Sequence, residues 1–199
     1  MPHKLKLPLT SKFDDALLLA SQLHREQGRK GTQIPYISHL LAVSAFVLEY
    51  GGTEAQAIAA LLHDAVEDCG GKPLLVKIEA QFGQEVAAIV EACTDSFEEG
   101  PKRGWKERKE EYLQHLRDCD SASLIVVAAD KLHNLTAIQR DLRLEGATLW
   151  SRFNAKPDLQ RWYYDSAIEI LKERLDNPIV TSLIEVFNRV RPQMIEPRN

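Results

Sequence analysis

Apolar residues recur at helical spacing along almost the whole of this 199-residue chain, and we find no convincing run of alternating apolar and polar residues between hairpin-turn signals. A period near 3.6 residues is typical of amphipathic α-helices, whereas strands with one buried face alternate with a period of two. The pattern therefore predicts an all-α fold, a compact bundle of several helices. Because 44% of the residues are apolar, a chain of this length can bury one substantial core, and we expect residues 1–199 to form a single domain.

Helix-capping residues and helix-breaking glycines and prolines divide this pattern into separate helices. We expect the first over 11–28, the second over 38–51 and the third over 53–69, where Thr53 and Gln56 make a capping-box signal. Further helices are expected over 73–82, 84–94, 105–117, 121–144, 158–175 and 177–190. Residues 95–104 are too rich in glycine, proline and charge for a regular helix and predict a flexible loop, and residues 191–199 predict a loose tail.

Charge, cysteines and hydropathy exclude several classes of protein. A formal net charge of -4 argues against a broad surface for a nucleic acid polymer, although a small anionic ligand could bind where positive charge is concentrated. Three cysteines without a CxxC pair indicate neither a disulfide framework nor a zinc knuckle. The longest apolar run, 124–129, is far shorter than a membrane span, and the N-terminus lacks a hydrophobic signal core. We therefore expect a cytoplasmic protein that binds no membrane.

The most informative segment is ALLHDAVED, residues 60–68. On one continuous α-helix, its ionisable residues would fall within a sector of roughly 140°; they are His63, Asp64, Glu67 and Asp68. Burying such groups beside an apolar core costs several kcal/mol unless they are paired or bound to a metal ion. Taken alone, a His-Asp pair more often lies on an ordinary exposed polar face, so the interpretation depends on the rest of the chain.

Two other segments place polar groups in core-like sequence. His39 opens an apolar helix in YISHLLAV, and Asp130 follows an apolar run in VVAADKLHNL. Three helices can thus direct side chains to one divalent ion, and the predicted metal ligands are His39, His63, Asp64 and Asp130. Two imidazoles and two carboxylates suit Mn²⁺, which we prefer, or Fe²⁺, and they tolerate Co²⁺, Zn²⁺ or Mg²⁺. His24 and His133 are expected to support or pack rather than to bind the ion.

In order and spacing, these motifs resemble the HD superfamily, and within it the hydrolase domain of the RelA/SpoT alarmone enzymes, especially their small stand-alone hydrolases. The resemblance extends from about residue 20 to residue 135. Its features are His24, Gln27, Arg29-Lys30, PYISH, ALLHDAVED, Phe82-Gly83 and ADKLHN. It implies a metal-dependent phosphohydrolase with the compact HD-domain bundle, and we expect the helices of 158–190 to pack on this motif core.

The resemblance also implies a reaction, the hydrolysis of the 3′-pyrophosphate of a guanosine polyphosphate, (p)ppGpp, to GDP or GTP and pyrophosphate, with Mn²⁺ as the usual ion. Glu67 and Asp68 are the implied catalytic pair that works on the nucleophilic water. We prefer Glu67 as the group that orients the water or accepts its proton, and Asp68 could share that role or assist the leaving group. The implied substrate contacts are Arg29, Lys30, Lys131 and Asn134. Lys131 stands where the family usually has arginine and Ala137 where it usually has threonine, so both changes affect the nucleotide contacts.

Other functions are open at this point. An adenosine alarmone, (p)ppApp, is an alternative substrate; another HD nucleotide phosphohydrolase, such as a 5′-nucleotidase, and a non-catalytic nucleotide-sensing HD module are alternative functions. The acidic pair Glu67-Asp68 and the basic pair Arg29-Lys30 favour the alarmone hydrolase. We expect a monomer or a homodimer; residues that could form an apolar C-terminal face are Trp150, Phe153, Ile184 and Phe187.

The segment 104–116 differs from the family pattern and brings Lys106, Arg108 and Lys109 to the start of a predicted helix. Basic side chains at this end oppose the helix dipole, which is tolerable if they meet an anion. The alternative is an exposed charged helix with i,i+4 ion pairs. Its place directly after the predicted loop would suit a lid over the substrate.

Overall fold

The computed structural model describes residues 9–95 and 103–195, and within these ranges the chain contains helices and no strand. The α-helices are α1 (Ser11–Leu23), α2 (Ile37–Glu49), α3 (Glu54–Leu62), α4 (Gly71–Phe82), α5 (Gln84–Cys93), α6 (Trp105–Asp118), α7 (Ser121–Glu145), α8 (Pro157–Arg174) and α9 (Pro178–Val190). A π-helical turn covers Val66–Gly70, and 3₁₀ helices cover Gly146–Arg152 and Arg191–Gln193. The prediction of an all-α fold is confirmed.

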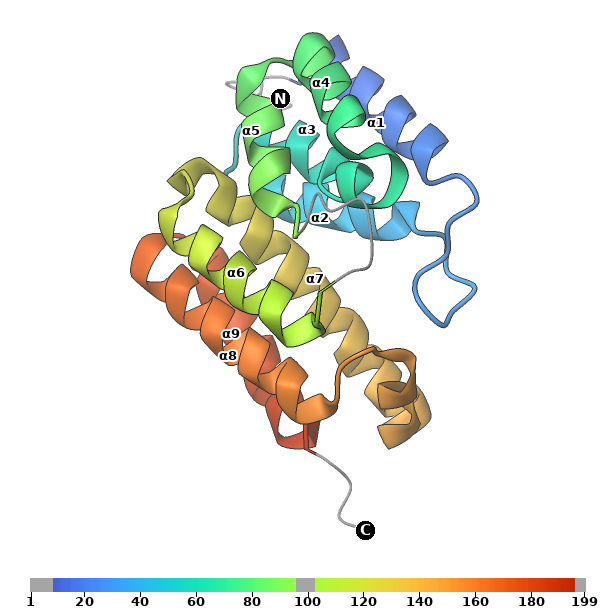
Figure 1. Ribbon diagram of the computed structural model, residues 1–199, viewed down its shortest axis with the longest axis vertical. Coiled ribbons are helices and arrows are strands. Elements are labelled where there is room, and N and C mark those ends of the chain that lie inside the picture. The colour runs from blue at the N-terminus through green and yellow to red at the C-terminus, as the bar shows by residue number, and fades with distance from the viewer. Residues whose placement is uncertain (1–8, 96–102, 196–199) are drawn as a thin grey trace, which may run out of the picture.

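Helix α7 is the centre of the bundle. In Figure 1 it runs between an upper group, α1 to α5, and a lower group that contains α6, α8 and α9. It packs against α2, α3 and α5 on one side and against α8 and α9 on the other. Every residue from 123 to 132 is buried, as expected for a helix that is surrounded by others. Asp130 and Lys131 lie in this stretch, so α7 carries two charged groups into the core.

The largest difference from the predicted helix boundaries lies after α3. The capping box of Thr53 and Gln56 is present. However, α3 ends at Leu62, and the chain then passes through two turn residues into the π-helical turn Val66–Gly70 instead of continuing as one α-helix. A π-helical turn contains more residues than an α-helical turn, so it changes the direction of the side chains that follow Asp64.

Smaller differences lie on either side of the loop before α2. Helix α1 ends at Leu23, five residues earlier than predicted. The residue that precedes α2 is Tyr36 rather than Ser38, and its side chain makes no capping hydrogen bond. The intervening loop is therefore longer than the sequence indicated, and it projects from the bundle beside α2 (Figure 1).

The start of the predicted loose tail is ordered and packs on the bundle through Met194. Arg191–Gln193 form a 3₁₀ turn, and Met194 is fully buried. Of the residues considered for a dimer face, Trp150 and Phe187 are buried in the core of the chain itself. Residues 96–102 of the predicted loop and 196–199 of the predicted tail lie outside the described ranges.

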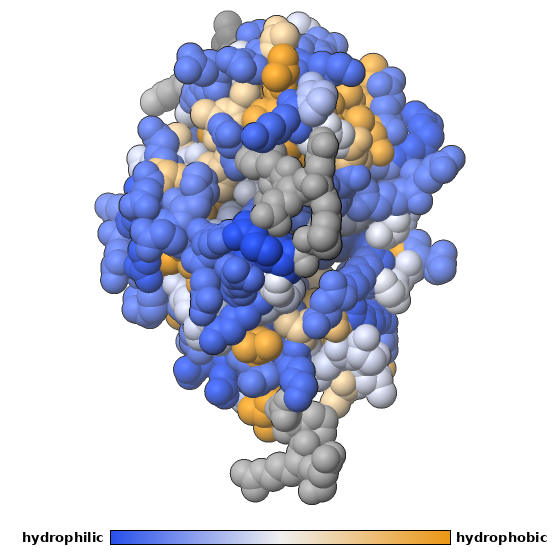
Figure 2. All heavy atoms as spheres, viewed as in Figure 1, coloured by the Kyte–Doolittle hydropathy of each residue, from blue (hydrophilic) through white to orange (hydrophobic). Residues whose placement is uncertain are grey.

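The surface carries scattered apolar side chains. Figure 2 shows a mainly hydrophilic face with hydrophobic side chains in small groups. The large apolar residues that are exposed are Leu9, Leu18, Leu41, Leu48, Val76, Leu144 and Ile195. Single exposed apolar residues are normal on soluble domains and do not by themselves mark an interface. Among the described helices, none is both long and apolar enough to cross a membrane.

Candidate active site

Three helices bring the predicted metal ligands to one point in the core. His39 lies in the first turn of α2, His63 directly follows α3, and Asp130 lies in the middle of α7. One ligand atom from each of these residues lies within 4.8 Å of the other two. Asp64 joins them, because its Oδ2 is 3.0 Å from His63 Nε2 and 3.5 Å from His39 Nε2. The structure therefore brings all four predicted ligands together, and we call these four residues the metal cluster.

His63 presents a free nitrogen to the metal cluster. Its Nδ1 lies 2.8 Å from the carbonyl oxygen of Ala60, to which a neutral imidazole can donate. Its Nε2 is buried and has no hydrogen-bond partner in the described part of the chain. A histidine with one nitrogen bound to a backbone carbonyl and the other free has the arrangement of a metal ligand. This orphaned nitrogen beside two carboxylates fits a divalent ion.

His133 orients His39 in a similar way. Their Nδ1 atoms lie 2.7 Å apart, so one imidazole must donate and the other accept. Burial, together with the charges of His39 and Arg29, lowers the pKa of His133 to about 4, so its ring is neutral and can accept. His39 Nδ1 then donates, and its Nε2 lies 3.3 Å from Asp130 Oδ1. The geometry gives His133 a supporting position beside His39, a predicted ligand.

The two carboxylates of the metal cluster favour a positive charge between them. Burial raises the pKa of both, but the charge of His63 holds the pKa of Asp64 well below its usual range. The ammonium group of Lys131 does the same for Asp130. Burial lowers the pKa of His63, yet the two carboxylates outweigh it and raise this pKa to about 10. A divalent ion would supply this positive charge in place of a proton.

Neighbouring polar groups hold both carboxylates in place. The Tyr36 hydroxyl donates to Asp64 Oδ2 at 2.6 Å, and burial followed by the Asp64 charge raises the pKa of Tyr36, so the hydroxyl keeps its proton. Lys131 Nζ lies 2.6 Å from Asp130 Oδ2, and Asn134 Nδ2 donates to Asp130 Oδ1 at 2.5 Å. Such outer hydrogen bonds orient metal ligands and keep them ionised.

A cavity of about 210 Å³, the metal cavity, opens on the cluster. Glu67 lies on its wall, where desolvation and then the charges of Asp95 and Asp64 raise the pKa of its carboxyl. Asp68 is not among the described residues that line the cavity. Its Oδ2 instead accepts a hydrogen bond of 2.8 Å from Gln27 Nε2. The structure therefore gives different surroundings to the two acids that the sequence treats as a pair.

The same architecture is found in known proteins. A family model described as an HD domain matches residues 16–158, which is more than half of the chain. The chain belongs to the HD-domain family. The order of motifs in the sequence, with His39, His63-Asp64 and Asp130 in succession, is therefore that of an HD domain, and the structure brings these predicted ligands together.

Relatives of this HD domain include alarmone hydrolases. Over 167 residues it is 36% identical to the guanosine-3′,5′-bis(diphosphate) 3′-pyrophosphohydrolase MESH1 of Xenopus tropicalis, with 80% of this chain and 85% of the relative aligned. It is 34% identical over 127 residues to a probable enzyme of the same activity from Synechocystis, with 62% of this chain and 16% of that longer protein aligned.

A solved structure agrees with these relatives. The structure of a metazoan SpoT orthologue, described as hydrolysing ppGpp, matches this HD domain with a TM-score of 0.72 and 27% identity, over 93% of this chain and 98% of the other. The resemblance to the RelA/SpoT hydrolases that the motifs indicated is confirmed.

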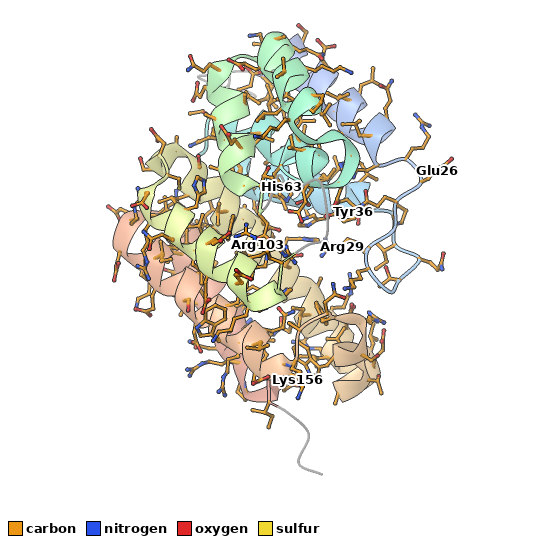
Figure 3. The ribbon with its side chains drawn as sticks, viewed as in Figure 1. Glu26, Arg29, Tyr36, His63, Arg103 and Lys156 are labelled. Atoms are coloured by element: carbon orange, nitrogen blue, oxygen red, sulfur yellow. The ribbon has the colours of Figure 1, made fainter. Side chains whose placement is uncertain are left out.

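A second pocket of this HD domain, about 280 Å³, adjoins the metal cavity. Arg29, Tyr36 and Asn134 line both spaces. Arg29 Nη2 donates to Asn134 Oδ1 at 2.6 Å, and the guanidinium carbon lies 5.5 Å from the centre of the Tyr36 ring. Figure 3 shows Arg29, Tyr36 and His63 in the region between the upper and lower groups of helices. Two predicted substrate contacts, Arg29 and Asn134, therefore lie where the two spaces meet.

The other two predicted contacts differ from each other. Lys30 lines the second pocket and is exposed. Lys131 is buried, with its ammonium group 5.5 Å from the ring centres of both Tyr112 and Tyr163. Although Lys131 lines the metal cavity, its ammonium group is bound to Asp130. This position favours support of Asp130, a predicted ligand, over contact with a substrate.

The sequence reasoning missed most of the second pocket. Its further lining includes Arg140, Leu149, Arg152, Phe153 and Tyr164. These residues come from the end of α7, the 3₁₀ helix Gly146–Arg152, the residue after it and α8, all beyond the last recognised motif. Arg140 Nε and Arg152 Nη1 bind the two oxygens of Asp141 at 2.9 and 3.1 Å. The arginines near the end of α7 are the one sequence feature that could have indicated this pocket, but they belong to no recognised motif.

Proposed function

We propose that this HD-domain protein hydrolyses the 3′-pyrophosphate of guanosine polyphosphates, (p)ppGpp, to give GDP or GTP and pyrophosphate. The observation that carries the proposal is a metal cluster that opens on a cavity lined by Glu67 and adjoins a basic pocket. The cavity suits a phosphoryl group and the pocket suits the nucleoside end of the same molecule. The activity named for MESH1 and for the metazoan SpoT orthologue supports this choice of substrate.

The residues that would hold the ion are His39, His63, Asp64 and Asp130, through the atoms that face one another. Two imidazoles and two carboxylates suit Mn²⁺, which we propose as the resident ion, with Fe²⁺, Co²⁺, Zn²⁺ and Mg²⁺ as alternatives. When bound, such an ion polarises a phosphoryl oxygen and lowers the pKa of a water molecule.

Glu67 orients the attacking water and accepts its proton. Its raised pKa brings its basicity closer to neutral pH than that of an ordinary carboxylate. The water oxygen forms a bond to the phosphorus that carries the 3′ oxygen, the bond between that phosphorus and the 3′ oxygen breaks, and the 3′ oxygen takes up a proton. Asp68 has a supporting role in this proposal, because its hydrogen bond to Gln27 ties the π-helical turn to the loop before α2.

The nucleotide lies across both spaces. Arg29 and Asn134 contact it where the metal cavity meets the second pocket, and Lys30 contacts its 5′-phosphates with the arginines of that pocket. Lys131 acts mainly through Asp130, although its charge also favours an anion in the metal cavity. The side chains that touch substrate thus come from the loop before α2, α7 and the 3₁₀ helix that follows it.

Ion-exchange analysis of the reaction products tests this function. Mn²⁺-loaded protein is incubated separately with ppGpp, ppApp, GMP and GTP, and His63→Ala protein is the control. We expect equimolar GDP and pyrophosphate from ppGpp with the wild type and no product with the control. Cleavage of ppApp alone would assign an adenosine alarmone, and cleavage of GMP or GTP alone would assign another nucleotide phosphohydrolase. No cleavage by protein that has bound Mn²⁺ would favour a nucleotide sensor.

The cytoplasmic location and the monomeric or homodimeric state stay predictions, as does the expectation of a small anionic nucleotide as partner rather than a nucleic acid polymer or a membrane. The burial of Trp150 and Phe187 removes two residues from the apolar face considered for a dimer. Size-exclusion chromatography with light scattering would determine the oligomeric state.

A further inference from the structure

Helix α6 contributes a cation to the wall of the metal cavity, the ammonium group of Lys109. The preceding basic residues of this helix have other surroundings. Lys106 is exposed, with its Nζ 3.6 Å from Glu110 Oε1, and Arg108 binds Asp95. The basic start of α6 therefore directs one charged side chain into the space beside the metal cluster.

Asp95 and two tyrosine rings hold the Lys109 ammonium group in place. Lys109 Nζ lies 3.1 Å from Asp95 Oδ2 and 5.0 and 5.6 Å from the ring centres of Tyr163 and Tyr112. Arg108 Nη1 binds the same carboxylate oxygen at 2.5 Å. The Asp95 side chain is only 7% exposed, and its Oδ1 has no hydrogen-bond partner among residues 9–95 and 103–195. Two cations thus share one carboxylate, which leaves positive charge at this wall.

Binding of a divalent ion would make the charge of the metal cavity more positive. Its described lining contains four carboxylates against the cations of Arg29, Lys109 and Lys131. A divalent ion would add two positive charges to this lining, which favours an anionic phosphate. Of the three cations, Arg29 donates to Asn134, and Lys131 has Asp130 as its own partner. Lys109 shares the Asp95 carboxylate with Arg108, so its ammonium group can also bind a second anion.

We infer that Lys109 is a further substrate-contacting residue, whose ammonium group binds oxygens of the pyrophosphate that is released from the 3′ position. This inference rests on the proposed function of the same site. A lysine ammonium group has three donors, so Lys109 can keep its bond to Asp95 and give others to phosphoryl oxygens. The contact stabilises negative charge on the transferring group, next to the ion and to Glu67.

Calorimetric titration with inorganic pyrophosphate tests this contact in Mn²⁺-loaded protein. The proteins compared are the wild type, Lys109→Met, Lys109→Arg and the matched control Lys106→Met, whose lysine lies on the same helix with a side chain 58% exposed. Lys109→Met leaves Asp95 paired with Arg108, so it strands no buried charge. Metal content and melting temperature are measured for each protein.

Loss of a charge-assisted contact predicts that Lys109→Met weakens pyrophosphate binding about 10- to 100-fold and lowers kcat/KM for ppGpp by a similar factor. Lys109→Arg should keep most of both properties, and Lys106→Met should stay within about twofold of the wild type. Metal content should be unchanged in all of them.

The inference is overturned if metal-loaded Lys109→Met binds pyrophosphate within about twofold of the wild type, or if the wild type binds none. The same measurements distinguish failure of this inference from failure of the proposed function. If Lys109→Met weakens pyrophosphate binding and the wild type does not cleave ppGpp, the anion contact stands and the alarmone reaction is wrong.

Discussion

The metal cluster and the second pocket meet at Arg29 and Asn134, yet they are built differently. The predicted ligands of the cluster lie in core helices or just after one, and His39 and His63 are only 1% and 3% exposed. The second pocket combines a loop, the end of α7, the 3₁₀ helix Gly146–Arg152 and α8, and its Arg152 forms ion pairs with Asp141 and Glu145. We therefore expect the metal cluster to determine the reaction and the second pocket to determine which nucleotide is bound.

The largest effect should come from the cluster. His63→Ala removes the free nitrogen, so we expect loss of bound Mn²⁺ and a fall in kcat/KM for ppGpp of about ten-thousandfold or more, because several kcal/mol of transition-state stabilisation is lost with the ion. Elemental analysis and activity are measured on the same samples. His115→Ala, an exposed histidine on α6, is the control. A normal metal content in His63→Ala would contradict the cluster.

Within the acidic pair, Glu67→Gln should keep the metal and lower kcat about 100- to 1000-fold, as expected for the loss of a general base. Asp68→Asn is the matched variant, and because Asp68 lies outside the cavity lining among the described residues, its kcat should fall less than about tenfold. Steady-state kinetics at saturating Mn²⁺ measures both. Equal losses of kcat in the two variants would contradict the different roles proposed for Glu67 and Asp68.

Tyr36→Phe should weaken Mn²⁺ binding about 10- to 100-fold, because it deletes the hydrogen bond to Asp64 while it keeps the ring that stacks on His24. Competition with a metal-binding dye gives the affinity. Tyr50→Phe, whose hydroxyl donates to Ser182 far along the chain, is the control for loss of a tyrosine hydroxyl. An unchanged affinity in Tyr36→Phe would show that Asp64 needs no such support.

The pH dependence should follow Glu67. The pKa of Glu67 is raised in the folded protein above the ordinary glutamate value of about 4.3. Only the ionised carboxylate can act as base, and this form is lost as the pH falls through the raised pKa. We expect kcat/KM at saturating Mn²⁺ to fall about tenfold per pH unit below that point. The residual kcat/KM of Glu67→Gln should not show this fall at acidic pH. A wild-type midpoint at or below the ordinary value would contradict the role of Glu67.

The smallest effect should come from the second pocket. Arg152→Ala should raise KM for ppGpp about 3- to 10-fold and leave kcat within about twofold, because it removes binding that is equal in the ground and transition states. Arg143→Ala is the control, since this arginine is exposed and is not among the described residues of the pocket. A fall in kcat of Arg152→Ala with an unchanged KM would show that the second pocket acts in the chemical step. The proposed difference between the pocket and the metal cluster would then be wrong.

The positions of the cluster residues could be predicted because each interrupts an apolar helical run. Asp130 after 124–129 is the clearest case, and α7 carries it into the core as that run indicates. The surroundings of Glu67 and Asp68 could not be predicted in the same way. The sector of roughly 140° assumed an uninterrupted α-helix, whereas the π-helical turn Val66–Gly70 gives the two acids different neighbours.

The second pocket could not be predicted because it depends on contacts between distant parts of the chain. Arg29 and Asn134 are 105 positions apart and meet only through the packing of the loop on α7. Similarly, a family motif gives the position of Lys131 but not its partner, and in the structure the adjacent Asp130 binds its ammonium group. Local periodicity contains no information on either contact.

The most direct test is a titration of metal-stripped protein with Mn²⁺ while pyrophosphate release from ppGpp is recorded. If one divalent ion at the cluster supports the reaction, release should be absent in the stripped protein, rise in proportion to added Mn²⁺ and reach a plateau at one ion per chain. Full activity without added metal, or no pyrophosphate at saturating Mn²⁺, would contradict it.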